Sequence, residues 1–423
     1  MRGGADQNNY QALCAQGALS PRRGDVANRT KAMYRNDVRT LVSKSLMVVV
    51  TVALAGCALA ACAPSASDGG AAAPARSSSS SPSVTEEPAE EAQAPLSGQV
   101  YVWGSTPGIL APVGVSTAPA PVPVPGMDDV VSAAAAADAI GVVRADGTAW
   151  WWGDLENGFG LVSAPMQIGE VADAVKIVPG FTTGSFQILT RSGAVYFFGN
   201  EGQFADGGAT GERGGTDGVL LSGLPKAAQL ASNTVLGSDG SVWVWGCQRS
   251  RTIAGYLDGT DPDACISFTQ LGNSELEDVV SISGANAVLS DGRVWSFATG
   301  DYEQGVTGAE STVSTWENRY FNLGNGTVVA KGNNAHGGLG VLGDGVGPVT
   351  VPGLSKITSA DTGYAGGTVA TTSDGRAWVW GTGAATYPAS LSPAADNAPV
   401  PIPDITGAIA AGDGFVLVSS PRN

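Results

Sequence analysis

Hydrophobic and polar residues alternate along seven short segments of the chain, and each segment follows a turn dipeptide. The clearest copies are SDGSVWVWG at 238–246, SDGRAWVWG at 373–381 and ADGTAWWWG at 145–153. An alternation of period two predicts a half-buried β-strand. Asp-Gly or Asn-Gly before it predicts a hairpin turn, because glycine takes positive φ without a Cβ clash. Looser copies lie at 97–104, 191–199, 290–298 and 324–332.

Successive turn glycines lie 34 to 52 residues apart, which is the length of a four-stranded propeller blade. The repeats begin at 97–104 with a second half that has no first half. They end at 408–420 with a first half that has no second half. These two halves are expected to pair, which removes two exposed sheet edges. The sequence therefore predicts an all-β, seven-bladed β-propeller over residues 96–420, closed by pairing of the N- and C-terminal half-repeats.

The segment before the repeats has the pattern of a bacterial lipoprotein leader. Three basic residues precede an apolar run at 46–55, which is too short to span a bilayer. LAGC and LAAC follow and end at Cys57 and Cys62, so lipidation is predicted at Cys57, with Cys62 as the alternative. An uncleaved anchor helix is the competing interpretation. Residues 33–62 form the signal and lipobox, and residues 1–32 are interpreted as an overcalled start or a disordered segment.

Residues 63–95 are rich in Ser, Ala, Pro and Glu and have almost no residue able to join a core, so a flexible tether is predicted. Beyond residue 56 the chain has 14 basic and 35 acidic residues. Such a surface repels phosphate backbones, which argues against nucleic acid as a partner. The prediction is a monomer on the outer face of the bacterial cell membrane, held there through its lipid anchor only.

The ALxxDGxVWxWG pattern and the glycine-rich tail GNNAHGGLGVLGDG at 332–345 resemble the regulator of chromosome condensation repeat family. The resemblance covers about residues 96–420 and implies a β-propeller. The founding member of that family acts on a small GTPase and chromatin, and an exported acidic lipoprotein meets neither. The chain is also similar in fold and export to the type II β-lactamase inhibitor protein. That similarity suggests loop aromatics that cap an enzyme, as an analogy of fold.

The sequence has few candidate catalytic or metal-binding residues. His336 is the only histidine, which excludes His-based triads and His-rich metal sites. The acidic loop 258–263 lacks the spacing of a calcium loop, and GLGVLG at 338–343 is explained by the repeat tail rather than by a nucleotide site. Neither a metal nor a cofactor is predicted. The turn aspartates Asp146, Asp239, Asp291 and Asp374 are expected to cap their own backbone.

Two cysteines, Cys247 and Cys265, flank one loop. In an exported protein this arrangement favours a disulfide over two free thiols. The tryptophans recur at the same strand positions and are expected to pack between blades.

Two classes of function remain. The first is a non-catalytic binding module for an extracellular protein or a cell-wall component. The second is a propeller lyase or hydrolase acting on a wall polymer or an antibiotic, which would need converging carboxylates in the channel. The sequence favours the first class. The connections between the first two strands of each repeat vary most and must share one face of the ring. The predicted partner-binding residues on this face are Trp316, Arg319, Tyr320, Phe181 and Tyr364, which are side chains typical of hot spots.

Overall fold

The structure is a computed structural model. It describes residues 96–155, 160–180, 184–199, 217–247, 265–272, 276–343, 345, 347–362, 367–382, 388, 391 and 394–420. The chain divides into two units, Met1–Glu87 and Pro88–Asn423, and every described residue belongs to the second. The predicted leader, both lipobox cysteines and the tether lie outside the described residues. No helix in the described part is long and apolar enough to cross a membrane.

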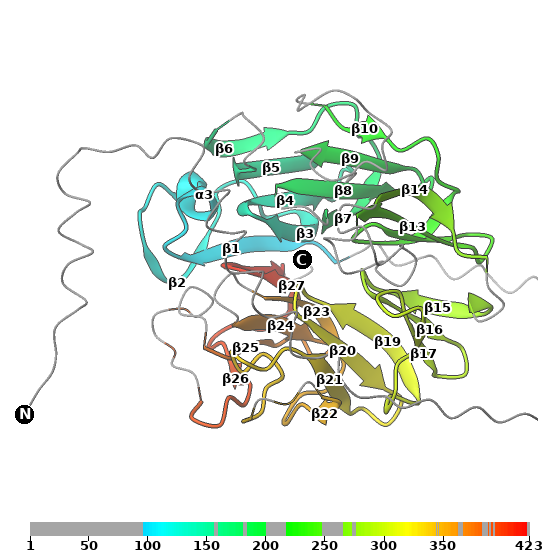
Figure 1. The fold of residues 1–423 in the computed structure, drawn as a ribbon. Helices are drawn as coiled ribbons and strands as arrows, with labels where there is room; N and C mark the ends of the chain where they lie inside the picture. Colours follow the sequence, from blue (N-terminus) through cyan, green and yellow to red (C-terminus); the bar gives the residue numbers. More distant parts are fainter. Residues whose placement is uncertain are drawn as a thin grey trace, which may run out of the picture. The chain divides into compact units, whose positions relative to one another are not determined.

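Five sheets have four antiparallel strands each (Figure 1). The first contains β7 (Ala174–Pro179), β8 (Ser185–Thr190), β9 (Val195–Gly199) and β10 (Val219–Leu220). The second contains β11 (Ala227–Ala231), β12 (Thr234–Gly237), β13 (Val242–Cys247) and β14 (Cys265–Gln270). The third contains β15 (Val279–Ile282), β16 (Asn286–Leu289), β17 (Val294–Ser296) and β18 (Asp301–Tyr302). The fourth contains β19 (Ala309–Ser314), β20 (Asn318–Leu323), β21 (Val328–Gly332) and β22 (Val349–Thr350). The fifth contains β23 (Ile357–Thr362), β24 (Thr368–Thr372), β25 (Ala377–Trp380) and β26 (Val400–Pro401).

The remaining eight strands form one continuous sheet in the order β27-β28-β1-β3-β4-β5-β6, with β2 paired to β1. These strands are β1 (Gly98–Gly104), β2 (Ala118–Pro123), β3 (Val130–Ala136), β4 (Asp138–Arg144), β5 (Ala149–Asp154), β6 (Val162–Gln167), β27 (Ala408–Gly412) and β28 (Phe415–Ser419). Helix α3 (Pro107–Leu110) and a 3₁₀ turn (Ala111–Val113) follow β1.

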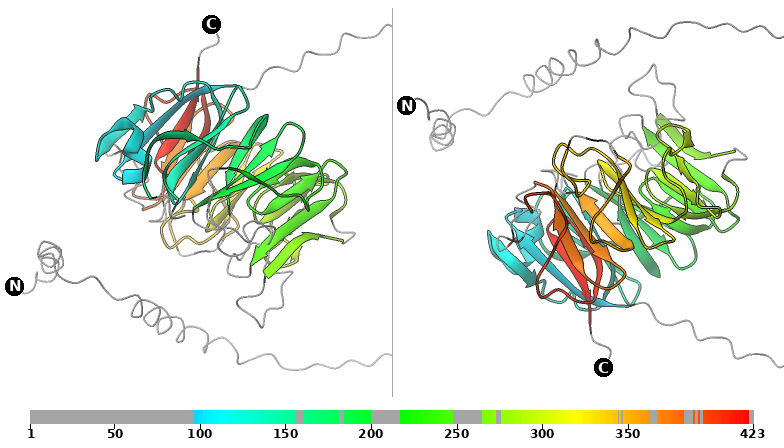
Figure 2. Two further views of the ribbon diagram at one scale, coloured as in Figure 1. Left: turned by 90° about the horizontal axis from the view of Figure 1, so that it is seen from above. Right: turned by 90° about the horizontal axis from the view of Figure 1, so that it is seen from below.

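The prediction of seven separate blades is therefore wrong, because the propeller has five four-stranded blades and one eight-stranded sheet. The sheet is continuous because Gly98 of β1 pairs with Val130 of β3, while β1 also pairs with β28 from Gly98↔Ser419 to Val102↔Phe415. The number of repeats in the sequence gives the number of copies of the unit. It does not show whether strands of two neighbouring copies hydrogen-bond to each other and form one sheet. The C-terminal strands lie beside β1 in both views of Figure 2.

Contacts between the first strands of successive repeats close the ring. β3 contacts β7, the chain of contacts continues through β11, β15, β19 and β23, and β27 contacts both β23 and β3. Each of these first strands has a register shift near its start, as between Val130 and Ser132 in β3. Such bulges bend a strand and increase its twist, which suits a strand that turns along the axis of a ring.

Large aromatic side chains fill the spaces between sheets. The last residue but one of the repeat motif is fully buried in six of the seven copies, as Trp103, Trp152, Phe198, Trp245, Phe297 and Trp380. The expectation that tryptophans pack between blades holds for Trp151, which lies 5.5 Å from Phe198 of the next sheet between ring centroids. The seventh copy has Lys331 at this position.

Candidate interaction face

The connections between the first and second strands of each repeat share one face of the ring, which we call the loop face. Its described residues are 137, 180, 184, 232–233, 283–285, 315–317, 367 and 413–414. They share a face because every repeat places its strands in the same order and the first two strands are antiparallel. The Asp-Gly turns between second and third strands lie on the opposite face, which we call the turn face.

Trp316 is the most exposed large hydrophobic residue on the loop face. It lies in the three-residue turn 315–317 between β19 and β20, and 69% of its surface is accessible. The turn is held by hydrogen bonds from Thr315 N to Asn318 O (2.8 Å) and from Asn318 N to the Thr315 hydroxyl (3.1 Å). The backbone of the turn is therefore fixed, and most of the Trp316 surface remains accessible.

Arg319 lies three residues further on and is half-buried beside a carboxylate of the neighbouring sheet. Its Nη1 is 3.7 Å from Oε1 of Glu303, and Lys331 Nζ donates a 2.6 Å hydrogen bond to Glu303 Oε2. Asn286 donates a third hydrogen bond, of 3.2 Å, to Glu303 Oε1. The Glu303 side chain is only 5% exposed, whereas Arg319 and Lys331 are each about a quarter exposed. The group therefore has one carboxylate and two cations, and its net charge is positive.

The pKa of Glu303 lies below its ordinary value of 4.5. Burial is the largest single effect and raises the pKa, but it is outweighed. The Lys331 hydrogen bond, the charges of Lys331 and Arg319 and the Asn286 hydrogen bond together lower the pKa of this carboxyl. Glu303 is thus held ionised and anchors two cations at the edge of the loop face.

Sequence reasoning missed Glu303 and Lys331, although one signal was present. Lys331 occupies the motif position where the other six copies have a buried aromatic residue. A lysine at such a position needs a counter-ion, because an unpaired buried charge is costly. Glu303 supplies it from 28 residues upstream, and no local pattern in the sequence identifies Glu303 as that partner.

Tyr320 does not lie on the loop face, contrary to expectation. It is fully buried, its hydroxyl donates a 2.7 Å hydrogen bond to Gly338 O, and its ring meets Trp380 edge-on at 5.7 Å between centroids. Burial raises the pKa of Tyr320 well above its usual value. The reason is strand alternation: β20 already begins at Asn318, so position 320 faces the next blade. Direct contact with a partner is not available to this side chain.

The other expected residues have mixed outcomes. Phe181 and Tyr364 lie outside the described residues, as does the acidic loop 258–263. Cys265 is disulfide-bonded, and Cys247 lies directly opposite it in the β13–β14 register. His336 is exposed.

The turn aspartates cap their own backbone as expected. Each accepts a hydrogen bond from the backbone N–H two residues on, at 2.9 Å from Thr148 to Asp146 and at 3.0 Å from Ser241 to Asp239. Asp291 and Asp374 do the same with Arg293 and Arg376, and Asn325 does so with Thr327. The pKa of Asp146 is lowered by the hydrogen bond from the Thr148 hydroxyl (2.6 Å) and then by the one from the Thr148 backbone N–H.

In the described part of the chain, two carboxylates, Asp138 and Asp154, lie close together, and a third, Asp361, lies in another sheet. Asp361, on innermost strand β23, accepts hydrogen bonds from the backbone N–H groups of Thr362 (2.8 Å) and Asp413 (3.2 Å), and burial raises its pKa. Asp138 and Asp154 lie opposite each other on β4 and β5. The pKa of Asp138 is raised by burial and then by the charge of Asp154. Among the described residues, no three His, Cys, Asp or Glu are grouped to hold a metal.

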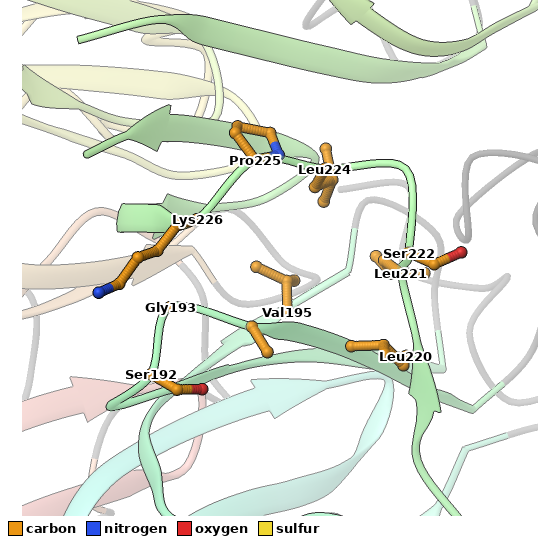
Figure 3. A pocket seen from close by; sticks show the side chains of 10 residues that line it. Ser192, Gly193, Val195, Leu220, Leu221, Ser222, Leu224, Pro225 and Lys226 are labelled. Carbon is orange, nitrogen blue, oxygen red and sulfur yellow. The ribbon is translucent and has the colours of Figure 1, made fainter. Parts of the chain in front are cut away.

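A shallow groove lies at the turn face, beside the outermost strand β10 (Figure 3). Its volume is about 380 Å³, and it is formed by the β8–β9 turn and the connection from β10 to β11. Val195 and Leu221 form its apolar lining, while Lys226 and Ser222 lie toward its two ends. The groove has one ionisable side chain, Lys226, so it does not supply an acid–base pair.

Comparison with known proteins defines the fold. No protein-family model and no curated protein sequence matches the chain. Human WBSCR16 matches with a TM-score of 0.59 and 18% identity, over 77% of this chain and 99% of that one. Prp20p from Saccharomyces cerevisiae matches with a TM-score of 0.61 and 16% identity, over 78% and 93%. Yeast RCC1 (Prp20), in a structure bound to Kap60, matches with a TM-score of 0.57 and 16% identity, over 78% of this chain and 91% of that one. The protein thus has the fold of an RCC1-type β-propeller.

Proposed function

We propose that this chain is a cell-surface lipoprotein whose β-propeller is a non-catalytic binding module, and that its loop face captures an extracellular protein or a cell-wall component. The observation that carries the proposal is the exposed indole of Trp316 on a rigid turn. Tryptophan and arginine are the side chains most enriched at interface hot spots. The lipidated location is supported by the leader sequence and its two lipobox cysteines.

The charges near Trp316 support a polar rim around an aromatic anchor. Arg319 is 3.7 Å from Glu303, longer than an ideal charge-assisted hydrogen bond. Its guanidinium therefore retains donors for an acceptor on a partner. An anchor of this kind needs few other strong contacts, because surrounding residues serve mainly to exclude water.

A capture experiment with the full-length chain tests the proposal. Wild type and Trp316→Ala are immobilised and exposed to the exported proteins and purified cell wall of the source organism, and retained material is quantified by mass spectrometry. We expect wild type to retain one component. Trp316→Ala should weaken the affinity for that component at least about tenfold, which corresponds to a binding free energy of about 1.4 kcal/mol.

Leu220→Ala is the matched control, because Leu220 is also a large exposed hydrophobic residue, at 46%, but lies on the outermost strand β10. It should retain the component at wild-type level, and both variants should unfold at the wild-type temperature. Equal retention by Trp316→Ala and wild type would show that the binding surface lies elsewhere.

A further inference from the structure

One position recurs on the innermost strand of every repeat, immediately after the bulge. We call these residues the axial ring: Ser132, Lys176, Gln229, Ser281, Ser311, Ser359 and Ala410. Every member is half-buried or exposed, although all lie on the strands that surround the axis. The following residue is buried between sheets in most repeats, as at Ile177, Leu230 and Ala411. Water therefore reaches the axial ring from the axis side.

Side chains of the axial ring hydrogen-bond to the next repeat. In each case the partner is the backbone of the residue that follows the axial-ring residue of that repeat. Ser132 Oγ accepts a 3.1 Å hydrogen bond from Ile177 N, and Ser359 Oγ accepts one of 2.8 Å from Ala411 N. Gln229 Oε1 accepts from Ile282 N at 3.2 Å. A neutral acceptor makes this link, and serine or glutamine supplies it.

Lys176 departs from this rule. An ammonium cannot accept a hydrogen bond, so the link is inverted and Nζ donates to Leu230 O at 2.9 Å. That bond uses one of three N–H donors. A serine would make the ordinary link without bringing a charge to the axis, so the link between repeats does not explain the lysine.

The charge of Lys176 also lacks a carboxylate partner in the part of the chain that the structure describes. None of the salt bridges there, at 4.0 Å or less, includes its Nζ. Asp361, the acidic residue on innermost strand β23, is bonded to backbone N–H groups on the other side of the ring. Burial lowers the pKa of Lys176, and no neighbouring charge opposes this effect. Protein surrounds the ammonium, yet more than a third of the residue remains accessible.

We propose that Lys176 binds one small oxyanion, of the phosphate or carboxylate class, at the axis of the ring. The free N–H donors of its ammonium supply the positive charge. Ser281 and Ser311 supply hydroxyl donors at the same level of the axial ring, whereas the Ser132 and Ser359 hydroxyls are already bonded to Ile177 O and to the Thr371 hydroxyl. Four of the seven axial-ring residues are serines and one is alanine, so short side chains leave the axis side of Lys176 accessible. An anion there would compensate the buried charge that no described side chain neutralises. This inference is independent of Trp316 and of the partner proposed above.

Titration calorimetry on the full-length chain at low ionic strength tests the site, with inorganic phosphate and acetate as probes. We expect saturable binding of at least one probe at a single site, weakened at least tenfold in Lys176→Gln. Lys176→Arg keeps the charge and should keep binding. Lys226→Gln is the matched control, because Lys226 is an exposed lysine on the turn face and its loss should leave binding unchanged.

Thermal unfolding provides a second measurement that does not depend on heat signals. A ligand that binds only the native state raises the unfolding temperature as its concentration rises. The bound probe should raise it for wild type and Lys226→Gln but not for Lys176→Gln. Absence of saturable binding of both probes at millimolar concentration, or equal binding by wild type and Lys176→Gln, would overturn the proposal.

Discussion

At the scale of single residues, Lys331 distinguishes the fourth four-stranded blade from the others. Its position holds a buried aromatic side chain in every other copy of the motif. Here an ion pair to Glu303 of the preceding blade takes the place of aromatic packing, at 2.6 Å. This exchange puts charge beside the turn that presents Trp316. The interface between the third and fourth four-stranded blades is therefore charged near the loop face, whereas aromatic side chains fill the other interfaces between blades.

The Glu303 carboxylate should make stability depend on pH in a defined window. Because its pKa is lower in the folded state, its contribution is complete above the unfolded value of 4.5 and is lost as pH falls through the folded value. Glu303→Gln should lower the free energy of unfolding by about 1–3 kcal/mol at pH 7. The difference from wild type should shrink below pH 4.5. Urea unfolding across this range measures it.

Glu310→Gln is the control for this series, because Glu310 is exposed on the adjacent strand β19. Its difference from wild type should remain small at every pH. A Glu303→Gln difference that stays constant with pH would show that the carboxylate is not the group that titrates.

Residue roles were predictable where the cause is local. The Asp-Gly turns were predicted correctly because an Asx turn needs only the aspartate and the two residues after it. Tyr320 was assigned wrongly because the start of β20 decides which way position 320 faces, and Asn318, where the strand begins, has no strand signal of its own. Glu303 could not be predicted, since its two cationic partners, Arg319 and Lys331, come from another blade.

At the scale of elements, the junction of β28, β1 and β3 depends on a glycine. Gly98 pairs with Ser419 on one side and with Val130 on the other. A Cβ atom at Gly98 would clash with the backbone oxygen of Val418 on β28. Strand positions and turns were predictable from alternation and from Asp-Gly dipeptides. The joining of two blades into one sheet was not, because it depends on the single residue pair Gly98↔Val130 between β1 and β3, which no sequence pattern marks.

Gly98→Ala should therefore destabilise the protein by about 1–3 kcal/mol, because the backbones must separate to admit the methyl group. Chemical denaturation followed by circular dichroism measures the change. Gly272→Ala is the control, since its Cβ would meet nothing within 4 Å and its φ is not left-handed. Equal stability of the two variants would show that the β28–β1–β3 junction carries no strain-sensitive contact.

At the scale of the whole molecule, the two ends of the described chain lie in one sheet. β28 supplies Phe415, Val416 and Leu417 to the core, all essentially inaccessible, and it pairs with β1 along five residues. In open repeat arrays each unit contacts only its neighbours, and loss of a terminal unit leaves the others folded. In a closed ring, loss of one strand exposes two sheet edges, and the neighbouring elements on both sides of the missing strand lose a contact.

A chain ending at Gly414 should therefore lose order well beyond the missing strand. Without β28, the open edge of β1 and the apolar face of β27 become exposed, and the contacts of β27 with β3 and β23 lose their support. We expect hydrogen–deuterium exchange to accelerate in β15 and β16, which are distant from the deletion around the ring, as well as in β1 and β3. A chain ending at Ser420 keeps every described strand and should exchange at the rates of the full chain. If β15 and β16 keep their protection in the chain ending at Gly414, the blades are independent units and closure by the terminal strands stabilises only its own sheet.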